Sequence, residues 1–196
     1  MNGPDPELTP ELNPDLTADL DTDPALAAAV LEIEEHIAEG GWDQPARLYA
    51  LVDTAQLVAR EPALAAAMGL DAASEEGSLT PVEQDQLAPD RPLESVLEAI
   101  AWPTGVAGCA AVVERLVLPP DADAEIPEDR ARAEEYAREH PDRQEVRIVA
   151  GVTRGGSTYC ALRLRAHDDA QSVVGGTDLV PALLELLRST LDDTEE

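Results

Sequence analysis

The chain of 196 residues contains no lysine and no phenylalanine, and only 3 % of its residues are aromatic. The absence of lysine excludes the P-loop, Schiff-base catalysis through lysine and the protein-kinase mechanism, because each of these requires that amine. The absence of phenylalanine predicts a core of modest area built from Ala, Leu and Val. Several common enzyme classes are therefore excluded.

Long apolar runs are absent as well. No segment reaches the roughly 18 consecutive apolar residues that a membrane-spanning helix needs. Residues 1–23 have neither the cationic start nor the apolar centre of a secretory signal. We therefore expect a cytoplasmic protein that makes no contact with a membrane.

Cysteine is rare. Cys109 and Cys160 are 51 residues apart and match no metal-binding or redox spacing. Each lies within an apolar strand pattern, and a reducing cytoplasm keeps thiols free. We predict two buried free thiols rather than a disulfide or a nucleophile.

Basic residues are scarce beside acidic ones. The chain has 41 Asp and Glu and 13 arginines, which gives a formal net charge of −28. Nucleic acids and anionic lipids bind basic surfaces, so the bulk charge argues against both as partners. Six arginines nevertheless lie within 28 residues, a stretch with a net charge of +3: Arg138, Arg143, Arg147, Arg154, Arg163 and Arg165. This stretch is the local exception in an acidic chain.

The chain divides into a tail and a domain. Residues 1–23 hold seven acidic residues, four prolines and no basic residue, a composition that cannot bury enough apolar surface to fold. We expect a disordered acidic tail over residues 1–23. Residues 24–192 are long enough for one core, and we expect them to form a single α+β domain.

The first helix is predicted over residues 24–39. Asp23 is a typical N-cap, and Pro24 suits the first helical position. Apolar residues then recur at helical spacing: Leu26, Val30, Ile33 and Ile37. The solvent face is predicted to carry Glu32, Glu34, Glu35 and Glu39.

The remaining elements follow from periodicity and from the positions of Gly and Pro. A helix over 54–68 is expected to break where Glu61 precedes Pro62, and residues 70–92 are predicted to be a loop, either flexible or functional. The other predicted strands are 46–52, 106–118, 144–152 and 158–165, and the other predicted helices are 92–100, 128–139 and 178–191. This order predicts an α+β fold, with an antiparallel sheet of about four strands and helices packed on it.

The last two predicted strands show the clearest alternation of apolar and polar residues. Their apolar sets share one face only if the loop has an odd number of residues, which favours a three-residue turn with a glycine bulge over residues 154–156. That register places Arg147 opposite Arg163 and Glu145 opposite Arg165 on the other face.

Four stretches together carry a family resemblance: GWDQPARLYALVDTA (41–55), AWPTGVAGCAAVVERLVLPP (101–120), HPDRQEVRIVAGVTRGG (140–156) and TDLVPALLELLRSTL (177–191). They resemble a conserved family of actinobacterial proteins that has no assigned activity. The resemblance covers nearly all of the chain from residue 24 on. It implies a cytoplasmic single-domain protein, and it implies no mechanism, ligand or catalytic residue.

Motifs of catalysis and metal binding do not emerge from the sequence. Gly155-Gly156-Ser157 lies in a predicted hairpin and is not a nucleophile elbow. The three histidines have no zinc-site spacing, and no acid/base pair stands out among 41 carboxylates. Glu114 is predicted to pair with a neighbouring arginine on the sheet. We expect no cofactor, no metal and no catalytic residue.

The candidate binding residues are Arg147, Arg163, Arg165, Trp42 and Trp102. The three arginines form what we call the arginine face. Because Arg147 and Arg163 repel one another, an anion should lie over them. The favoured source is internal, namely Glu145, Glu114 or the acidic helix 128–139. The alternative is a docking site for an acidic peptide, phosphate or carboxylate read by arginine forks.

Trp42 and Trp102 each stand beside a predicted turn. Core packing is the favoured role for both, and an anchor for a ligand or partner is the alternative.

Two hypotheses about function remain. The favoured one is a non-enzymatic cytoplasmic interaction domain that binds a protein partner or a second copy of itself. The alternative is a domain that binds or transforms a small anionic ligand at the arginine face, with a tryptophan nearby. The alternative requires a deep pocket with convergent polar groups and shifted pKa values, whereas the first hypothesis does not.

Overall fold

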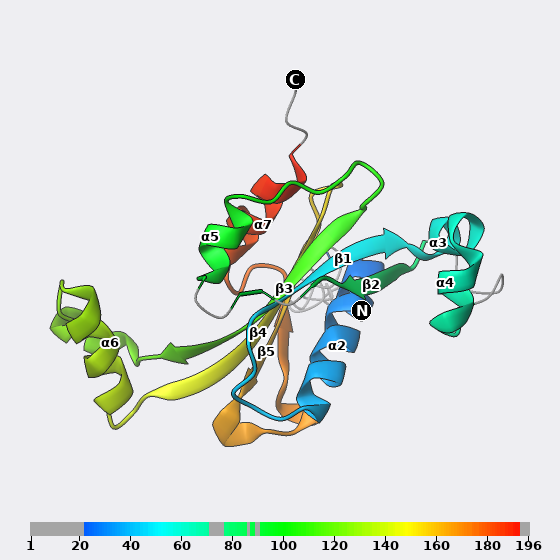
Figure 1. Cartoon of the computed structure of the whole chain (residues 1–196). Coiled ribbons are helices and arrows are strands. Elements are labelled where there is room, and N and C mark those ends of the chain that lie inside the picture. Colours follow the sequence, from blue (N-terminus) through cyan, green and yellow to red (C-terminus); the bar gives the residue numbers. More distant parts are fainter. Residues whose placement is uncertain (1–21, 71–76, 86, 89–90, 193–196) are drawn as a thin grey trace, which may run out of the picture.

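A computed structural model gives the fold, and it describes residues 22–70, 77–85, 87–88 and 91–192 (Figure 1). Nearly all of the predicted acidic tail, residues 1–21, lies outside the described residues. So does part of the predicted loop 70–92. Within the described residues, no helix is long and apolar enough to cross a membrane.

One antiparallel sheet of six strands organises the described residues, in the order β2-β1-β3-β4-β5-β6. The strands are β1 (Arg47–Asp53), β2 (Leu79–Glu83), β3 (Gly108–Val117), β4 (Gln144–Thr153), β5 (Thr158–Leu164) and β6 (Val174–Gly176). The α+β class is confirmed, and the expected number of about four strands is wrong.

The two missed strands, β2 and β6, form the edges of the sheet. β2 lies inside the segment predicted to be a loop, because Pro81 reads as a strand breaker. β6 has only three residues, two of them glycine, so it shows no periodicity. Both strands depend on pairing with a neighbour rather than on their own pattern.

Helices cover both faces of the sheet. They are α2 (Pro24–Glu39), α3 (Thr54–Arg60), α4 (Pro62–Ala67), α5 (Leu93–Leu97), α6 (Arg130–Glu139) and α7 (Pro181–Leu191), with short 3-10 turns at Pro120–Glu125, Arg165–His167 and Ala170–Ser172. Figure 1 shows α5 and α7 on one side of the sheet and α2 on the other. The predicted break between Glu61 and Pro62 separates α3 from α4 and is confirmed.

The strands bury a different core on each face. One core lies under α5 and α7, with Leu97, Leu184, Leu187 and both cysteines among its members. The other lies under α2, where Leu26, Val30 and Ile33 pack on the alternate residues of β1, β3 and β4. Because side chains of a strand alternate between faces, each central strand contributes to both cores.

Cys109 and Cys160 are free and buried, as predicted. The Cys109 Sγ lies 3.5 Å from Thr190 Oγ1 and 3.7 Å from the Leu187 carbonyl oxygen. Burial raises the pKa of Cys109 to about 11 and also raises the pKa of Cys160. Both thiols therefore stay protonated and unreactive at neutral pH.

Helix α2 begins and lies on the sheet as its sequence dictates. The Asp23 carboxylate accepts hydrogen bonds from the backbone N–H groups of Ala25 and Leu26, at 3.0 and 3.2 Å. Gly151 of β4 permits close packing, since a Cβ atom there would lie 2.7 Å from Cγ2 of Val30. The helix therefore approaches β4 more closely than a side chain at position 151 would allow.

The β4–β5 hairpin has the predicted register, with Arg147 opposite Arg163. Its loop is residues 154–156, closed by a hydrogen bond from the Gly156 N–H to the Thr153 carbonyl. Gly156 has φ of +92°, the left-handed conformation that the glycine bulge requires. The predicted three-residue turn is confirmed.

Helix α6 lies away from the arginine face. It has no buried residue, and Figure 1 shows it at the far end of the β3–β4 ribbon, apart from the other helices. A helix that is polar on all sides gains little by packing on a core. The expectation that this helix, predicted at 128–139, could cover the arginine face is therefore wrong.

Candidate functional site

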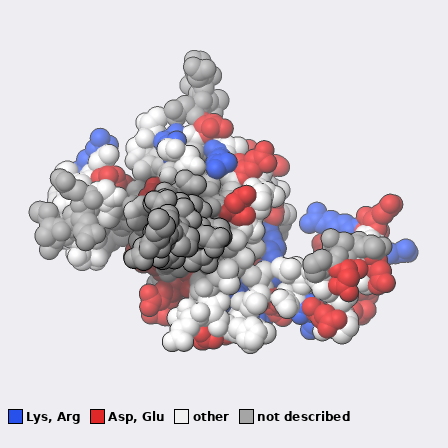
Figure 2. Space-filling view, turned by 180° about the vertical axis from the view of Figure 1, so that it is seen from behind, with Lys and Arg blue, Asp and Glu red and all other residues white. Residues whose placement is uncertain are grey.

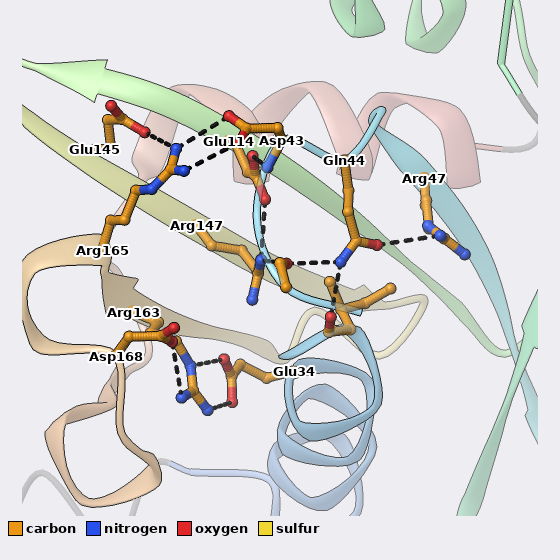
Figure 3. A network of polar contacts seen from close by, with 12 residues as sticks. Glu34, Asp43, Gln44, Arg47, Glu114, Glu145, Arg147, Arg163, Arg165 and Asp168 are labelled. Carbon is orange, nitrogen blue, oxygen red and sulfur yellow. Dashed lines mark hydrogen bonds and ion pairs between the residues drawn. The ribbon is translucent and has the colours of Figure 1, made fainter. Parts of the chain in front are cut away.

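The arginine face lies on the α2 side of the sheet, and its first member, Arg147, is completely buried. Its guanidinium donates to the Glu114 carboxylate at 3.0 Å (Figure 3) and to the Gly41 carbonyl, and its Cζ lies 4.4 Å from the centre of the Trp42 ring. Glu114 is directly opposite Arg147 in the pairing of β3 with β4. The prediction that Glu114 pairs with a neighbouring arginine is confirmed.

Arg165 forms the exposed rim of this network. Its guanidinium donates hydrogen bonds to both carboxylate oxygens of Asp43, each at 3.0 Å, and to the Glu145 carboxylate at 2.5 Å. These hydrogen bonds raise the pKa of Arg165, and they lower the pKa of Asp43 below its usual 3.8. Trp42 lies beside both arginines, with Arg165 Cζ 5.7 Å from its ring centre.

Arg163 pairs with a residue of α2. Its guanidinium makes a bidentate contact with the Glu34 carboxylate, at 2.5 and 2.9 Å, and a longer contact of 3.4 Å with Asp168. The side chains are nearly inaccessible, because Arg163 is 5 % exposed and Glu34 is 3 % exposed. Glu34 therefore belongs to the buried face of α2, and its predicted place on the solvent face is wrong.

These contacts give the arginine face a structural role. Arg163 ties α2 to the sheet, and Arg147 and Arg165 hold the loop that leads from α2 to β1 through Gly41 and Asp43. The Asp43 backbone N–H adds a 2.8 Å bond to Glu114. Repulsion between the opposed arginines is offset by a separate carboxylate for each. An external anion is not needed to balance their charge.

Trp102 lies on the opposite side of the sheet from the other candidate residues. It is 8 % exposed and belongs to the core under α5 and α7. Its backbone N–H donates to the Thr190 carbonyl, and Arg154 donates to its carbonyl oxygen at 2.9 Å. The structure thus brings Trp42 together with Arg147 and Arg165, and it places Trp102 elsewhere.

Among the described residues of the face seen in Figure 2, acidic and arginine side chains are interspersed. The open feature of the α2 side is instead the edge strand β2. Hydrogen bonds join Gln84 N–H to the Leu48 carbonyl and Thr54 N–H to the Ser78 carbonyl. In the antiparallel register of β1 and β2, where Tyr49 lies opposite Glu83, these bonds mean that the even-numbered residues of β2 bond to β1.

The odd-numbered residues of β2 therefore point their backbone groups away from the sheet. Leu79 and Glu83 offer an N–H and a carbonyl each, and Pro81 offers a carbonyl. Among the described residues, no strand pairs with this outer edge. Pro81 fits here because its missing N–H falls on the outward side, where β1 requires no donor.

A groove of about 560 Å³ runs between β2 and α2. We call it the edge groove, and the lining residues that matter most are Ala25, Ala28, Glu32, Met68, Leu79 and Pro81. The small alanines of α2 leave the space open, and Leu79 and Pro81 form the wall on the strand side. The hydroxyls of Thr54 and Thr80 near its end are 2.8 Å apart and bond to each other.

A smaller hollow of about 170 Å³ shares Glu32 and Pro81 with the edge groove and is also lined by His36, Tyr49 and Glu83. Glu83 accepts from Arg47 at 2.7 Å and from the Tyr49 hydroxyl at 3.4 Å. Burial and the nearby Glu83 raise the pKa of Tyr49 to about 12. Sequence reasoning missed this site because a proline at the centre of a five-residue segment argues against a strand, and only the pairing with β1 shows that the missing N–H of Pro81 lies on the outward side.

Comparison with known protein families gives a match over most of the chain. The model of the PPA1309-like protein family matches residues 26–192. No curated protein and no solved structure matches the chain. The family match agrees with the resemblance of the sequence to a conserved family without an assigned activity. Because the match covers most of the chain, the protein belongs to the PPA1309-like family.

Proposed function

We propose that the chain is a non-enzymatic cytoplasmic interaction domain that binds a protein partner at the edge groove. The observation that carries this proposal is the outer edge of β2, with which no strand of the described residues pairs, beside a groove between β2 and α2. An extended segment of a partner can continue the sheet through the backbone groups of Leu79, Pro81 and Glu83 and place alternate side chains in the groove.

The geometry gives less support to a small-anion site at the arginine face. Arg147 and Arg163 are inaccessible, and Arg165 is already bound to two carboxylates. An anion would have to displace Glu34 or Glu114 from partners that they hold in a buried environment. The edge groove needs no such rearrangement, since its backbone donors and acceptors already face outward.

Amide hydrogen exchange of the full chain tests the proposal. In the free chain, the Leu79 and Glu83 amides should exchange at least about 100-fold faster than those of Val82 and Gln84, which face β1. In a complex with a partner isolated from cells, the Leu79 and Glu83 amides should become protected. A stable complex in which both amides still exchange at the free rate contradicts the proposal.

A further inference from the structure

We propose that the segment bound in the edge groove is an extended peptide with one basic and two apolar side chains at alternate positions. The inference rests on the proposed function, and it adds the chemistry of the partner. Its basis is the face to which each residue of β2 projects, together with the charge at one end of the groove.

The register sets which partner residues enter the groove. Leu79, Pro81 and Glu83 pair with Asp53, Leu51 and Tyr49 of β1. Leu51 and Tyr49 belong to the core under α2, so the odd-numbered residues of β2 project toward α2. Directly opposed residues of paired strands project to the same face. Partner residues opposite Leu79, Pro81 and Glu83 therefore also project toward α2.

The first two of these positions accept apolar side chains. The groove there is lined by Ala25, Ala28 and Met68 in addition to Leu79 and Pro81. A volume of about 560 Å³ is in the range of pockets that hold drug-sized ligands. Val, Leu or Ile side chains would bury apolar surface on both walls at once.

The third position favours a cation. Opposite Glu83, the hollow contains the exposed carboxylate of Glu32, and the whole chain carries a net charge of −28. Arg47 already balances Glu83, which leaves Glu32 as the carboxylate that a basic side chain would meet. The partner sequence is then basic-x-apolar-x-apolar if its strand runs antiparallel to β2, and the reverse order if it runs parallel.

Two other occupants fit the charge less well. The N-terminal segment carries Leu8, Leu12, Leu16 and Leu20, but it is acidic throughout and would meet Glu32 with like charge. A second copy of the chain, paired edge to edge through β2, would bring two strongly negative molecules together. Complementary charge therefore favours a separate basic partner.

Four synthetic peptides test the inference on the full chain by fluorescence anisotropy: Arg-Thr-Val-Thr-Val, its reverse Val-Thr-Val-Thr-Arg, and the glutamate counterparts Glu-Thr-Val-Thr-Val and Val-Thr-Val-Thr-Glu. The better arginine peptide should bind at least about tenfold more tightly than its own glutamate counterpart at low ionic strength, and raising the salt to about 0.5 M should reduce that ratio. It should also protect the Leu79 and Glu83 amides. Which of the two arginine peptides binds better gives the strand direction.

A matched pair of variants locates the charge. Glu32→Gln should weaken binding of the arginine peptide about three- to tenfold, whereas Glu35→Gln, exposed on the same helix but outside the groove, should leave it unchanged. Equal binding of the arginine and glutamate peptides, or no binding by any of them, overturns the inference. The proposed function survives that result if a native complex still protects the Leu79 and Glu83 amides.

The competing occupants give distinct results. A peptide of residues 8–20 that displaces the arginine peptide at lower concentration than the unlabelled arginine peptide itself overturns the inference in favour of the chain's own segment. Protection of Leu79 and Glu83 in the free chain that increases with protein concentration overturns it in favour of self-association.

Discussion

The two flanks of α2 use the same kind of side chain in opposite ways. On the side of β4 and β5, Glu34 is buried and accepts hydrogen bonds from Nε and Nη2 of Arg163. Two residues earlier on the same helix, Glu32 is exposed above the edge groove. The first flank is closed by ion pairs within the chain, and the second is open to a partner.

The difference shows that the clustered arginines of this chain are bound to its own carboxylates. The arginines at 147, 163 and 165 project toward carboxylates from α2, β3 and the loop after α2, and these pairs fix α2 on the sheet. Their clustering in sequence follows from the hairpin that carries them. The hydrogen-bonding groups that face outward are instead backbone N–H and C=O groups of β2. Every residue carries such groups, so amino-acid composition does not indicate where they are available.

The largest expected effect comes from breaking the closed flank. Glu34→Gln removes the charge partner of a buried arginine, and such losses cost about 3–5 kcal/mol. Glu32→Gln, two residues away, should change the free energy of unfolding by less than about 0.5 kcal/mol. Urea unfolding of both variants measures the difference. Similar losses in the two variants would show that the two flanks do not differ as described.

A double change separates the cost of an unpaired charge from the value of the pair. Glu34→Leu combined with Arg163→Met replaces both charges by apolar side chains of similar length, and we expect it to recover most of the stability that Glu34→Gln loses. If the double variant is as unstable as Glu34→Gln, the ion pair stabilises the fold by an amount that apolar packing at the same two positions does not replace.

The sequence predicted the closed flank in large part. The alternation of two strands and an odd loop determine the register of β4 with β5, so the opposed arginines follow from residue spacing. For Glu114 the sequence predicts only a neighbouring arginine on the sheet, and the pairing of β3 with β4 identifies that arginine as Arg147. Glu34 was missed because charged residues were assigned to solvent as a group. Its position four residues after Val30 places it beside the apolar stripe and could have identified it.

The open flank could not be predicted in the same way. β2 has a proline at its centre and only five residues, so its own pattern argues against a strand. It forms because β1 supplies a full ladder on one side. The edge groove depends further on where α2 crosses the sheet, which is set by contacts between residues far apart in sequence.

A substitution at Gly151 tests the comparison with a smaller expected effect, because both flanks depend on how closely α2 packs on the sheet. A side chain at this position would press on Val30 and Leu26, and overpacking of a buried site costs about 1–3 kcal/mol. We therefore expect Gly151→Val to lower the free energy of unfolding by that amount and to alter the amide spectrum on both flanks of α2.

Gly155 is the matched control for this change. A Cβ atom there would meet only Thr153 Oγ1, at an ordinary 3.6 Å. Gly155→Ala should leave stability within about 0.5 kcal/mol of the parent chain. If Gly151→Val has no larger effect than Gly155→Ala, the close approach of α2 does not set the packing of this face.

The smallest expected effect lies at the exposed rim of the closed flank, where Arg165 holds Asp43. Asp43 has φ of +64°, a left-handed conformation that asparagine also adopts readily, so Asp43→Asn removes the charge and keeps the backbone. The pKa of Asp43 is lowered in the folded chain from 3.8, chiefly by the hydrogen bond from Arg165. The carboxylate is therefore favoured by folding, and its contribution is fully present above pH 3.8 and lost as the pH falls through the lowered value.

Comparing stability across pH tests this rim contact directly. Asp43→Asn should be slightly less stable than the parent chain at pH 6, and the difference should shrink as the pH falls below about 3.8. Arg165→Gln should remove the same pH dependence, because it removes the guanidinium that lowers the pKa of Asp43.

Glu32→Gln serves as the control on the open flank, where no basic side chain of the described residues pairs with Glu32. Denaturant unfolding between pH 2.5 and 6 measures all four proteins. A gap between Asp43→Asn and the parent that stays constant over this range would mean that the ion pair contributes nothing through its charge, and the rim would then be held by Trp42 and Glu145 alone.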